Sequence, residues 1–168
     1  MDSFKNWDLQ RTYTYITDAP DFVYEYLPSS FGLDSKTRSD WETYNDRQKV
    51  VLPDFRVDVL DIYDTAGPVI AHIVGRATSL TGAKFEMEYM MLIHIRSEYN
   101  AHTGRALKIH RVEEWIDSKY AASFFGNEKK RLDARKRARA AAASRAAARP
   151  TSIELRNGST LEMRAAKL

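Results

Sequence analysis

The stretch FEMEYMMLIHI, residues 85–95, decides the fold class of this chain. Its apolar and acidic residues alternate at first, and a period of two predicts a β-strand with one buried face. We expect this face to line an apolar pocket, with Phe85, Met87 and Met91 as candidate ligand-binding residues. The odd positions share the face, which is apolar apart from one phenol: Phe85, Met87, Tyr89, Met91, Ile93 and Ile95.

Three other segments continue the strand pattern outward from this stretch. Residues 55–63 alternate, residues 69–80 are β-branched and mostly apolar, and residues 106–118 complete the set. Turn sequences separate them: TAGP before the second, TGAK before residues 85–99, and NAHTG at 100–104. These signals predict four long antiparallel strands.

The part of the chain before these strands carries helix signals instead. Residues 7–17 can form a helix, and residues 17–27 resemble a second, short one that Pro28 stops. A capping box begins at Ser39, and apolar residues then recur at helical spacing up to Pro53. Helices followed by antiparallel strands form an α+β pattern. We expect a cone-shaped, curved antiparallel sheet packed against the N-terminal helices around a cavity.

The composition is that of a soluble globular protein. The 168 residues, 43% hydrophobic and 29% charged, suffice for one domain with a real core. Cysteine is absent, which excludes disulfides and thiolate metal sites. The sequence has no apolar run as long as a signal peptide or a membrane span. We therefore expect a cytoplasmic protein that does not bind membranes.

The charge of the chain divides sharply at Gly126. Residues 1–126 carry a net charge of −5, and residues 127–168 carry a net charge of +8. The second part is rich in alanine and arginine, so residues 128–148 are expected to be helical, with a final hairpin that turns at Asn157. We expect a domain at 1–126 and a separable basic helical tail at 127–168. The cation clusters of the tail make a nuclear location the alternative, but nucleic-acid binding is disfavoured because the tail has no aromatic residue for base stacking.

A second acidic stretch, VEEWIDSKY at 112–120, supplies the candidate chemistry. On the predicted strand Glu114 shares a face with Val112 and Ile116. Desolvation then disfavours the charged carboxylate and raises its pKa toward a range useful for proton transfer. Tyr89 is a candidate donor to a substrate oxygen on which charge develops, and Val112 is a further ligand-binding candidate. The competing interpretation of Glu114 is an exposed or ion-paired strand residue.

Other polar residues of the strands are weaker candidates. Asp61 could be a second pocket carboxylate that forms an acid/base pair with Glu114, although a solvent-facing position is the simpler interpretation. His72, His94 and His110 lie on three different strands without metal-ligand spacing, so no metal site is expected. The sequence also lacks nucleotide-binding and nucleophile motifs. The enzyme chemistry that we expect is acid/base chemistry without a cofactor.

The two acidic stretches also carry a family resemblance. FEMEYMMLIHI followed by VEEWIDSKYAASFF resembles the Y-x-N-E-Y…E-[FW]-V-D-S-x-Y signature of fungal SnoaL-like proteins, in the nuclear-transport-factor-2-like superfamily. Upstream, APDFVYEYLPSSFG resembles the family's second-helix and loop pattern, and DFRVDVLDIYD resembles its first long strand. The likeness covers roughly residues 8–125. It implies a cone of curved sheet around an apolar pocket and, for many fungal relatives, an isomerase, cyclase or dehydratase of a natural-product pathway.

The resemblance assigns positions within the motif. Tyr89 matches its second tyrosine and Glu88 its glutamate, while Glu114 matches the pocket glutamate and Asp117 the following aspartate. The chain begins where the family's long first helix is nearly over, so the resemblance implies either a shortened gene model or a fold that lacks one wall of its cone. The sequence departs from the family pattern in four places: Phe85 for tyrosine, Met87 for asparagine, Asp18 for arginine and Tyr24 for histidine.

Three functions follow from these observations. The first is a cofactor-independent acid/base enzyme that acts on an apolar polycyclic, terpenoid or polyketide intermediate of fungal secondary metabolism, with Glu114 and Tyr89 as catalytic residues. The second, favoured by Phe85, Met87 and Asp18, is a non-catalytic ligand-binding or assembly module of the same fold. The third is a nuclear or nucleic-acid role of the basic tail. The expected partners are a small apolar ligand and, through the sheet, a second copy of the chain.

Overall fold

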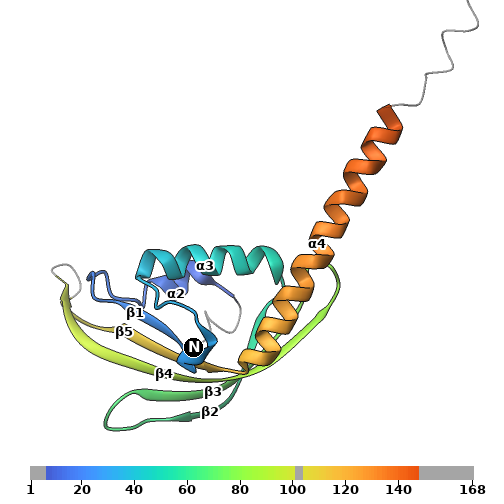
Figure 1. Cartoon of the computed structure of the whole chain (residues 1–168). Helices are drawn as coiled ribbons and strands as arrows, with labels where there is room; N and C mark the ends of the chain where they lie inside the picture. The colour runs from blue at the N-terminus through green and yellow to red at the C-terminus, as the bar shows by residue number, and fades with distance from the viewer. Residues whose placement is uncertain (1–6, 101–103, 148–168) are drawn as a thin grey trace, which may run out of the picture. The chain divides into compact units, whose positions relative to one another are not determined.

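One curved sheet forms the centre of the structure. The structure is a computed structural model and describes residues 7–100 and 104–147. Five strands form the sheet in the order β1-β5-β4-β3-β2, and the sheet does not close on itself. Helices α2 (Leu9–Tyr13) and α3 (Arg38–Val51) lie over its concave face (Figure 1). This arrangement confirms the predicted α+β class with helices on one face of a curved sheet.

The four predicted antiparallel strands are present, and each pairs with its neighbour along the chain. The buried row of β4 follows the predicted alternation, and its exposure rises only toward the open end of the sheet, where Ile95 is 45% exposed. On β5 the register shifts so that His110 is left without a partner in the ladder, and Ile109 takes the place beside Ile95. His110 therefore does not share a face with Val112, contrary to the predicted alternation. The four strands are β2 (Arg56–Tyr63), β3 (Val69–Thr78), β4 (Lys84–Asn100) and β5 (Gly104–Ile116).

The predicted helix at residues 17–27 is wrong, because this segment contains a strand, β1 (Val23–Leu27). β1 pairs in parallel with β5 and places Tyr26 beside Glu114. Its two tyrosines are buried and alternate with half-buried residues, and aromatic residues at a period of two favour a strand. The prolines on either side suggested helix boundaries, but proline is equally compatible with the ends of an edge strand. A short 3-10 helix, η1 (Ser29–Phe31), follows β1.

Helix α3 begins with a capping box that lies two residues before the predicted one. Thr37 is the N-cap residue, and its hydroxyl accepts a hydrogen bond from the backbone N–H of Asp40. The Asp40 carboxylate in turn accepts one from the backbone N–H of Thr37, which satisfies two donors at the helix start. The helix buries Trp41 and Asn45. Both residues matter for the site, because they lie on the side of α3 that lines a cavity.

Helix α4 (Ser118–Ala147) begins before the composition of the chain changes. The chain divides by its contacts into two compact units that meet between Lys130 and Arg131. The first unit contains the sheet, and its part of α4 buries Ala121, Phe124 and Glu128. Glu128 is 1% exposed and accepts hydrogen bonds from the backbone N–H and the hydroxyl of Thr81. The first unit thus extends beyond the boundary expected at Gly126.

The described part of the second unit, residues 131–147, is a mostly exposed basic helix, as expected for residues 128–148. The hairpin predicted around Asn157 lies outside the described residues. Within the described part of the chain, no helix combines the length and the apolar character that a membrane crossing requires.

Candidate active site

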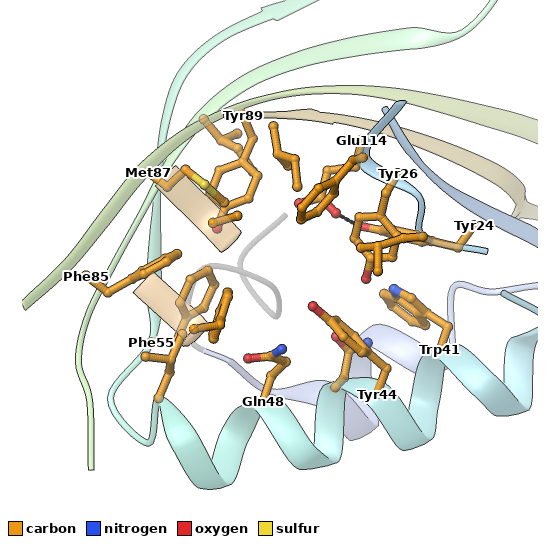
Figure 2. Close-up of a pocket in the computed structure, with 18 of the residues that line it drawn as sticks. Tyr24, Tyr26, Trp41, Tyr44, Gln48, Phe55, Phe85, Met87, Tyr89 and Glu114 are labelled. Carbon is orange, nitrogen blue, oxygen red and sulfur yellow. Dashed lines mark hydrogen bonds between the residues drawn. The ribbon is translucent and has the colours of Figure 1, made fainter. Parts of the chain in front are cut away.

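A cavity of about 310 Å³ lies between the concave face of the sheet and helix α3 (Figure 2). This volume falls within the range typical of small-molecule sites. The sheet contributes four residues of the predicted site, Glu114, Tyr89, Met87 and Phe85. Across the cavity, α3 contributes Trp41, Tyr44 and Gln48.

Phe85 and Met87 line this cavity as predicted, although their role in ligand binding stays a prediction. The ring of Phe85 lies 4.9 Å from that of Phe124 and 6.2 Å from that of Phe55, measured between centroids. This end of the cavity is therefore aromatic. Gly75 on β3 allows the rings of Phe55 and Tyr89 to lie close to the backbone of the sheet. A Cβ at this position would lie 2.8 Å from the ring of Phe55 and 2.9 Å from the ring of Tyr89.

Glu114 is the carboxyl group of this cavity. It is 9% exposed, and the hydroxyl of Tyr24 donates a hydrogen bond of 2.6 Å to its Oε2. Among the residues that the structure describes, Tyr24 is the one hydrogen-bond partner of this carboxyl, and no cation pairs with it. Burial raises its pKa from 4.5 to about 7, against the smaller lowering effect of the Tyr24 hydrogen bond. Near pH 7 both the acid and the base form of Glu114 are therefore populated.

Four tyrosines surround this carboxyl: Tyr24, Tyr26, Tyr44 and Tyr89. Burial is the largest cause that raises the pKa of each phenol above its ordinary value, and the nearby Glu114 carboxyl adds to the rise. All four phenols therefore keep their protons at any ordinary pH and act as hydrogen-bond donors. Tyr89, the predicted donor, makes no side-chain hydrogen bond within the described part of the chain. Its hydroxyl is thus available to a bound molecule.

Met91 and Val112 do not line the cavity that contains Glu114. They line a second, more apolar cavity of about 370 Å³ on the same concave face. Ile73 and the stacked rings of Tyr24 and Trp41, whose centroids lie 5.3 Å apart, border both cavities. The predicted ligand-binding row therefore divides between two neighbouring cavities.

Asp61 and Glu114 are not brought together. Asp61 is exposed on β2, lines neither of these two cavities, and accepts a hydrogen bond from the backbone N–H of Ile62. The acid/base pair that the sequence suggested for these two residues therefore does not form. The simpler interpretation of Asp61 as a solvent-facing residue agrees with the structure.

The three histidines that the structure describes do not line the cavity of Glu114. His72 contacts Glu88 at 2.5 Å, and the rings of His94 and His110 lie 6.1 Å apart. Across residues 7–100 and 104–147, no three histidines or carboxylates come together in a group that could hold a metal ion. The titratable groups that line the cavity are Glu114 and the four phenols.

Sequence reasoning did not predict the tyrosines beside Glu114 or the residues that face it across the cavity. Tyr24 was noted only as the position where the family pattern has histidine, and Tyr26 was not noted, because their segment was interpreted as a helix, although the period of two in VYEYL was a usable signal. Tyr44 and Gln48 belong to a helix whose inner face is partly polar, so apolar periodicity does not single them out. No local signal indicated which of these side chains would reach Glu114.

Comparisons with known proteins identify the fold. No protein-family model matches the sequence, and a search of curated proteins finds no match. Solved structures do match, at identities that support a shared fold alone. AusH from Aspergillus nidulans is 23% identical, with a TM-score of 0.53, over 69% of this chain and 77% of that one.

Two further structures agree. The BvnE pinacolase from Penicillium brevicompactum is 17% identical, with a TM-score of 0.59, over 80% of this chain and 89% of that one. An NTF2-like protein of unknown function from Burkholderia pseudomallei is 15% identical, with a TM-score of 0.54, over 73% of this chain and 88% of that one. The chain thus has the fold of NTF2-like proteins, as the resemblance implied.

Proposed function

We propose that this protein is an acid/base enzyme in which Glu114 moves a proton on a small apolar substrate. The observation that carries the proposal is the buried Glu114 carboxyl, whose pKa is raised to about 7 in a cavity of largely aromatic walls. A carboxyl with a pKa near the working pH can both accept and return a proton. The reaction class is an isomerisation, cyclisation or dehydration, as proposed from the sequence.

The steps follow from the positions of the side chains. The Glu114 carboxylate takes a proton from a carbon next to a carbonyl group of the substrate, and the electron pair of the broken C–H bond moves onto the carbonyl oxygen. The free hydroxyl of Tyr89 donates a hydrogen bond to that oxygen and stabilises its negative charge. In a substrate with a C=C bond next to this carbon, the carbonyl then re-forms, the electron pair shifts through the conjugated system, and Glu114 returns the proton to the far carbon of that bond, which completes a double-bond isomerisation. Tyr24 acts on Glu114 itself, since its O–H fixes the orientation of the carboxyl.

The solved structures of this fold give limited support. One of them is named a pinacolase, so this fold serves an enzyme in at least one case. The apolar walls of the cavity favour an apolar substrate of polycyclic, terpenoid or polyketide type over a charged metabolite.

The second candidate function is a non-catalytic binding module, and Phe85 favours it. In catalytic relatives this position often carries a tyrosine. Here the ring is 2% exposed and packs against Phe55 and Phe124, so it supplies no hydroxyl to the cavity. A binding module would hold the same apolar ligand without proton transfer.

Deuterium exchange separates the two candidates without knowledge of the substrate. The protein is incubated in D2O with 1-tetralone, an apolar bicyclic ketone, and exchange at the carbon next to the carbonyl is followed by proton NMR. The proposal predicts exchange faster than in buffer, with a rate that rises as one group of pKa near 7 loses its proton. Glu114→Gln should lower this rate by about 10²–10⁴-fold, while Asp61→Asn, the matched exposed carboxylate, should leave it unchanged. Equal rates in the parent and in Glu114→Gln would overturn the proposal, and binding without exchange would support the binding module.

A further inference from the structure

The side of the cavity opposite Glu114 carries two amide side chains, Asn45 and Gln48, both from α3. Residues three apart on a helix lie on the same face, and both side chains line this cavity. Asn45 is 6% exposed. Gln48 extends from α3 between Phe55 and Tyr44 toward the interior (Figure 2).

Each amide has a buried polar atom without a hydrogen bond. The Nδ2 of Asn45 and the Oε1 of Gln48 are shut off from solvent and have no partner in the described part of the chain. The Asn45 amide lies beside the Tyr13 phenol and limits the rise in its pKa as a hydrogen-bonding neighbour, although its Nδ2 atom makes no hydrogen bond of ordinary length. The Gln48 amide likewise lowers the pKa of Tyr44, as an N–H donor to the phenol does. The carbonyl oxygen of Gln48 is therefore left for another partner.

Such atoms call for an explanation, since buried polar groups in native proteins are nearly always hydrogen-bonded and an unpaired one destabilises the fold. Here the two atoms lie on residues that line the same cavity, and one is a donor and the other an acceptor. A ligand group that both accepts and donates would satisfy both. A hydroxyl group has this property, because it carries one O–H donor and two acceptor lone pairs.

We propose that Asn45 and Gln48 recognise a hydroxyl group of the substrate at the end remote from Glu114. The substrate class is then a hydroxylated apolar ketone: the carbonyl side lies by Glu114 and Tyr89, the hydrocarbon body lies between the aromatic walls, and the hydroxyl lies against α3. This inference rests on the proposed function for the position of the carbonyl group. A site built to hydrogen-bond a hydroxyl discriminates strongly against the analogue without it, because its polar atoms are then left unpaired.

Binding measurements with matched ketones test the inference. Isothermal titration calorimetry at pH 6 compares 1-tetralone with 6-hydroxy-1-tetralone and 7-hydroxy-1-tetralone, which place the hydroxyl at two positions of the far ring. The full-length protein should bind at least one hydroxylated ketone about tenfold more tightly than 1-tetralone. In Gln48→Leu this preference should shrink to less than threefold, while the affinity for 1-tetralone is kept or increased.

Controls separate a local effect from a loss of structure. Lys49→Leu changes the next residue of α3, which is exposed, and should keep the preference. If Gln48→Leu fails to fold by circular dichroism, Gln48→Met replaces the amide with an unbranched side chain of similar length. Asn45→Val should reduce the preference as well.

The outcomes distinguish this inference from the proposed function. Equal affinity for the three ketones, no binding of either hydroxylated ketone at millimolar concentration, or a preference that survives in Gln48→Leu and Asn45→Val would each overturn the role of the amides. The Glu114-dependent exchange of 1-tetralone could still stand in these cases. Conversely, a hydroxyl preference that depends on Gln48 supports the inference even if no exchange is detected, and the protein would then be a selective binding module.

Discussion

The substitution Glu114→Gln should stabilise the protein at neutral and alkaline pH but not at acid pH. The pKa of this carboxyl is raised from 4.5 to about 7 in the folded state. Between these two pH values the folded protein holds a proton that the unfolded chain has lost, so the stability of the parent falls as the pH rises through this window and levels off above it. A shift of this size corresponds to about 3 kcal/mol.

Glutamine resembles the protonated carboxyl in size and keeps an oxygen that can accept the hydrogen bond from Tyr24. It has no charge to lose, so it escapes the destabilisation. The free energy of unfolding of Glu114→Gln should therefore lie close to that of the parent at pH 4.5 and exceed it by about 3 kcal/mol at pH 8.

Urea denaturation followed by tryptophan fluorescence measures this difference, since Trp7 and Trp41 are buried in the same unit as Glu114. Contributions of other titrating groups cancel when the two proteins are compared at each pH. Asp61→Asn serves as the control for an exposed carboxylate, and its difference should stay within about 0.5 kcal/mol at every pH. A difference for Glu114→Gln that does not change with pH, or a variant less stable than the parent at pH 8, would refute the reasoning. The carboxylate would then be a stabilising charge and not a desolvated acid.

Three further predictions concern the surroundings of the site. Tyr24→Phe removes the one hydrogen bond that lowers the pKa of Glu114, so carbon-13 NMR titration of the carboxyl should give a higher pKa than in the parent; an unchanged or lower value would contradict the assignment. Truncation after Lys130 should keep the unfolding transition of the first unit. Truncation just before Glu128 should instead lower the free energy of unfolding of this unit by about 1–3 kcal/mol in urea, because Thr81 loses its buried hydrogen-bonding partner. Equal stability of the two truncated chains would contradict this. Gly75→Ala would force a Cβ within 3 Å of two rings and should cost about 1–3 kcal/mol in the same assay, and a neutral result would show that the rings move freely.

The sequence predicted the parts of the fold that depend on strong local patterns. Residues 85–91 alternate without interruption, and β4 buries this row as expected. β1 was missed because an edge strand of five residues between prolines gives a weak signal, and its pairing with β5 is decided by tertiary contacts. Similarly, the change of face at His110 arises from one extra residue in β5, which alternation alone does not reveal.

The candidate site was predictable in one half and not in the other. Alternation on β5 placed Glu114 with Val112 and Ile116, and from that position the raised pKa followed. The partner of the carboxyl did not follow, because Tyr24 lies 90 residues earlier in the chain. The amides of α3 were also beyond sequence reasoning, since Asn45 and Gln48 look like ordinary surface residues of a helix until the cavity is known.

The 90-residue separation between Tyr24 and Glu114 determines how late in synthesis the pocket can form. The hairpins β2–β3, β3–β4 and β4–β5 join neighbouring segments and close short loops, whereas β1 meets β5 after nearly the whole described domain has been traversed. Contacts that close long loops carry a larger entropic cost and tend to form late in folding. A nascent chain in which β1 has left the ribosome but β5 has not therefore contains no complete pocket. The hydrogen bond between Tyr24 and Glu114 can form only when the last long strand has been synthesised and has paired with the first.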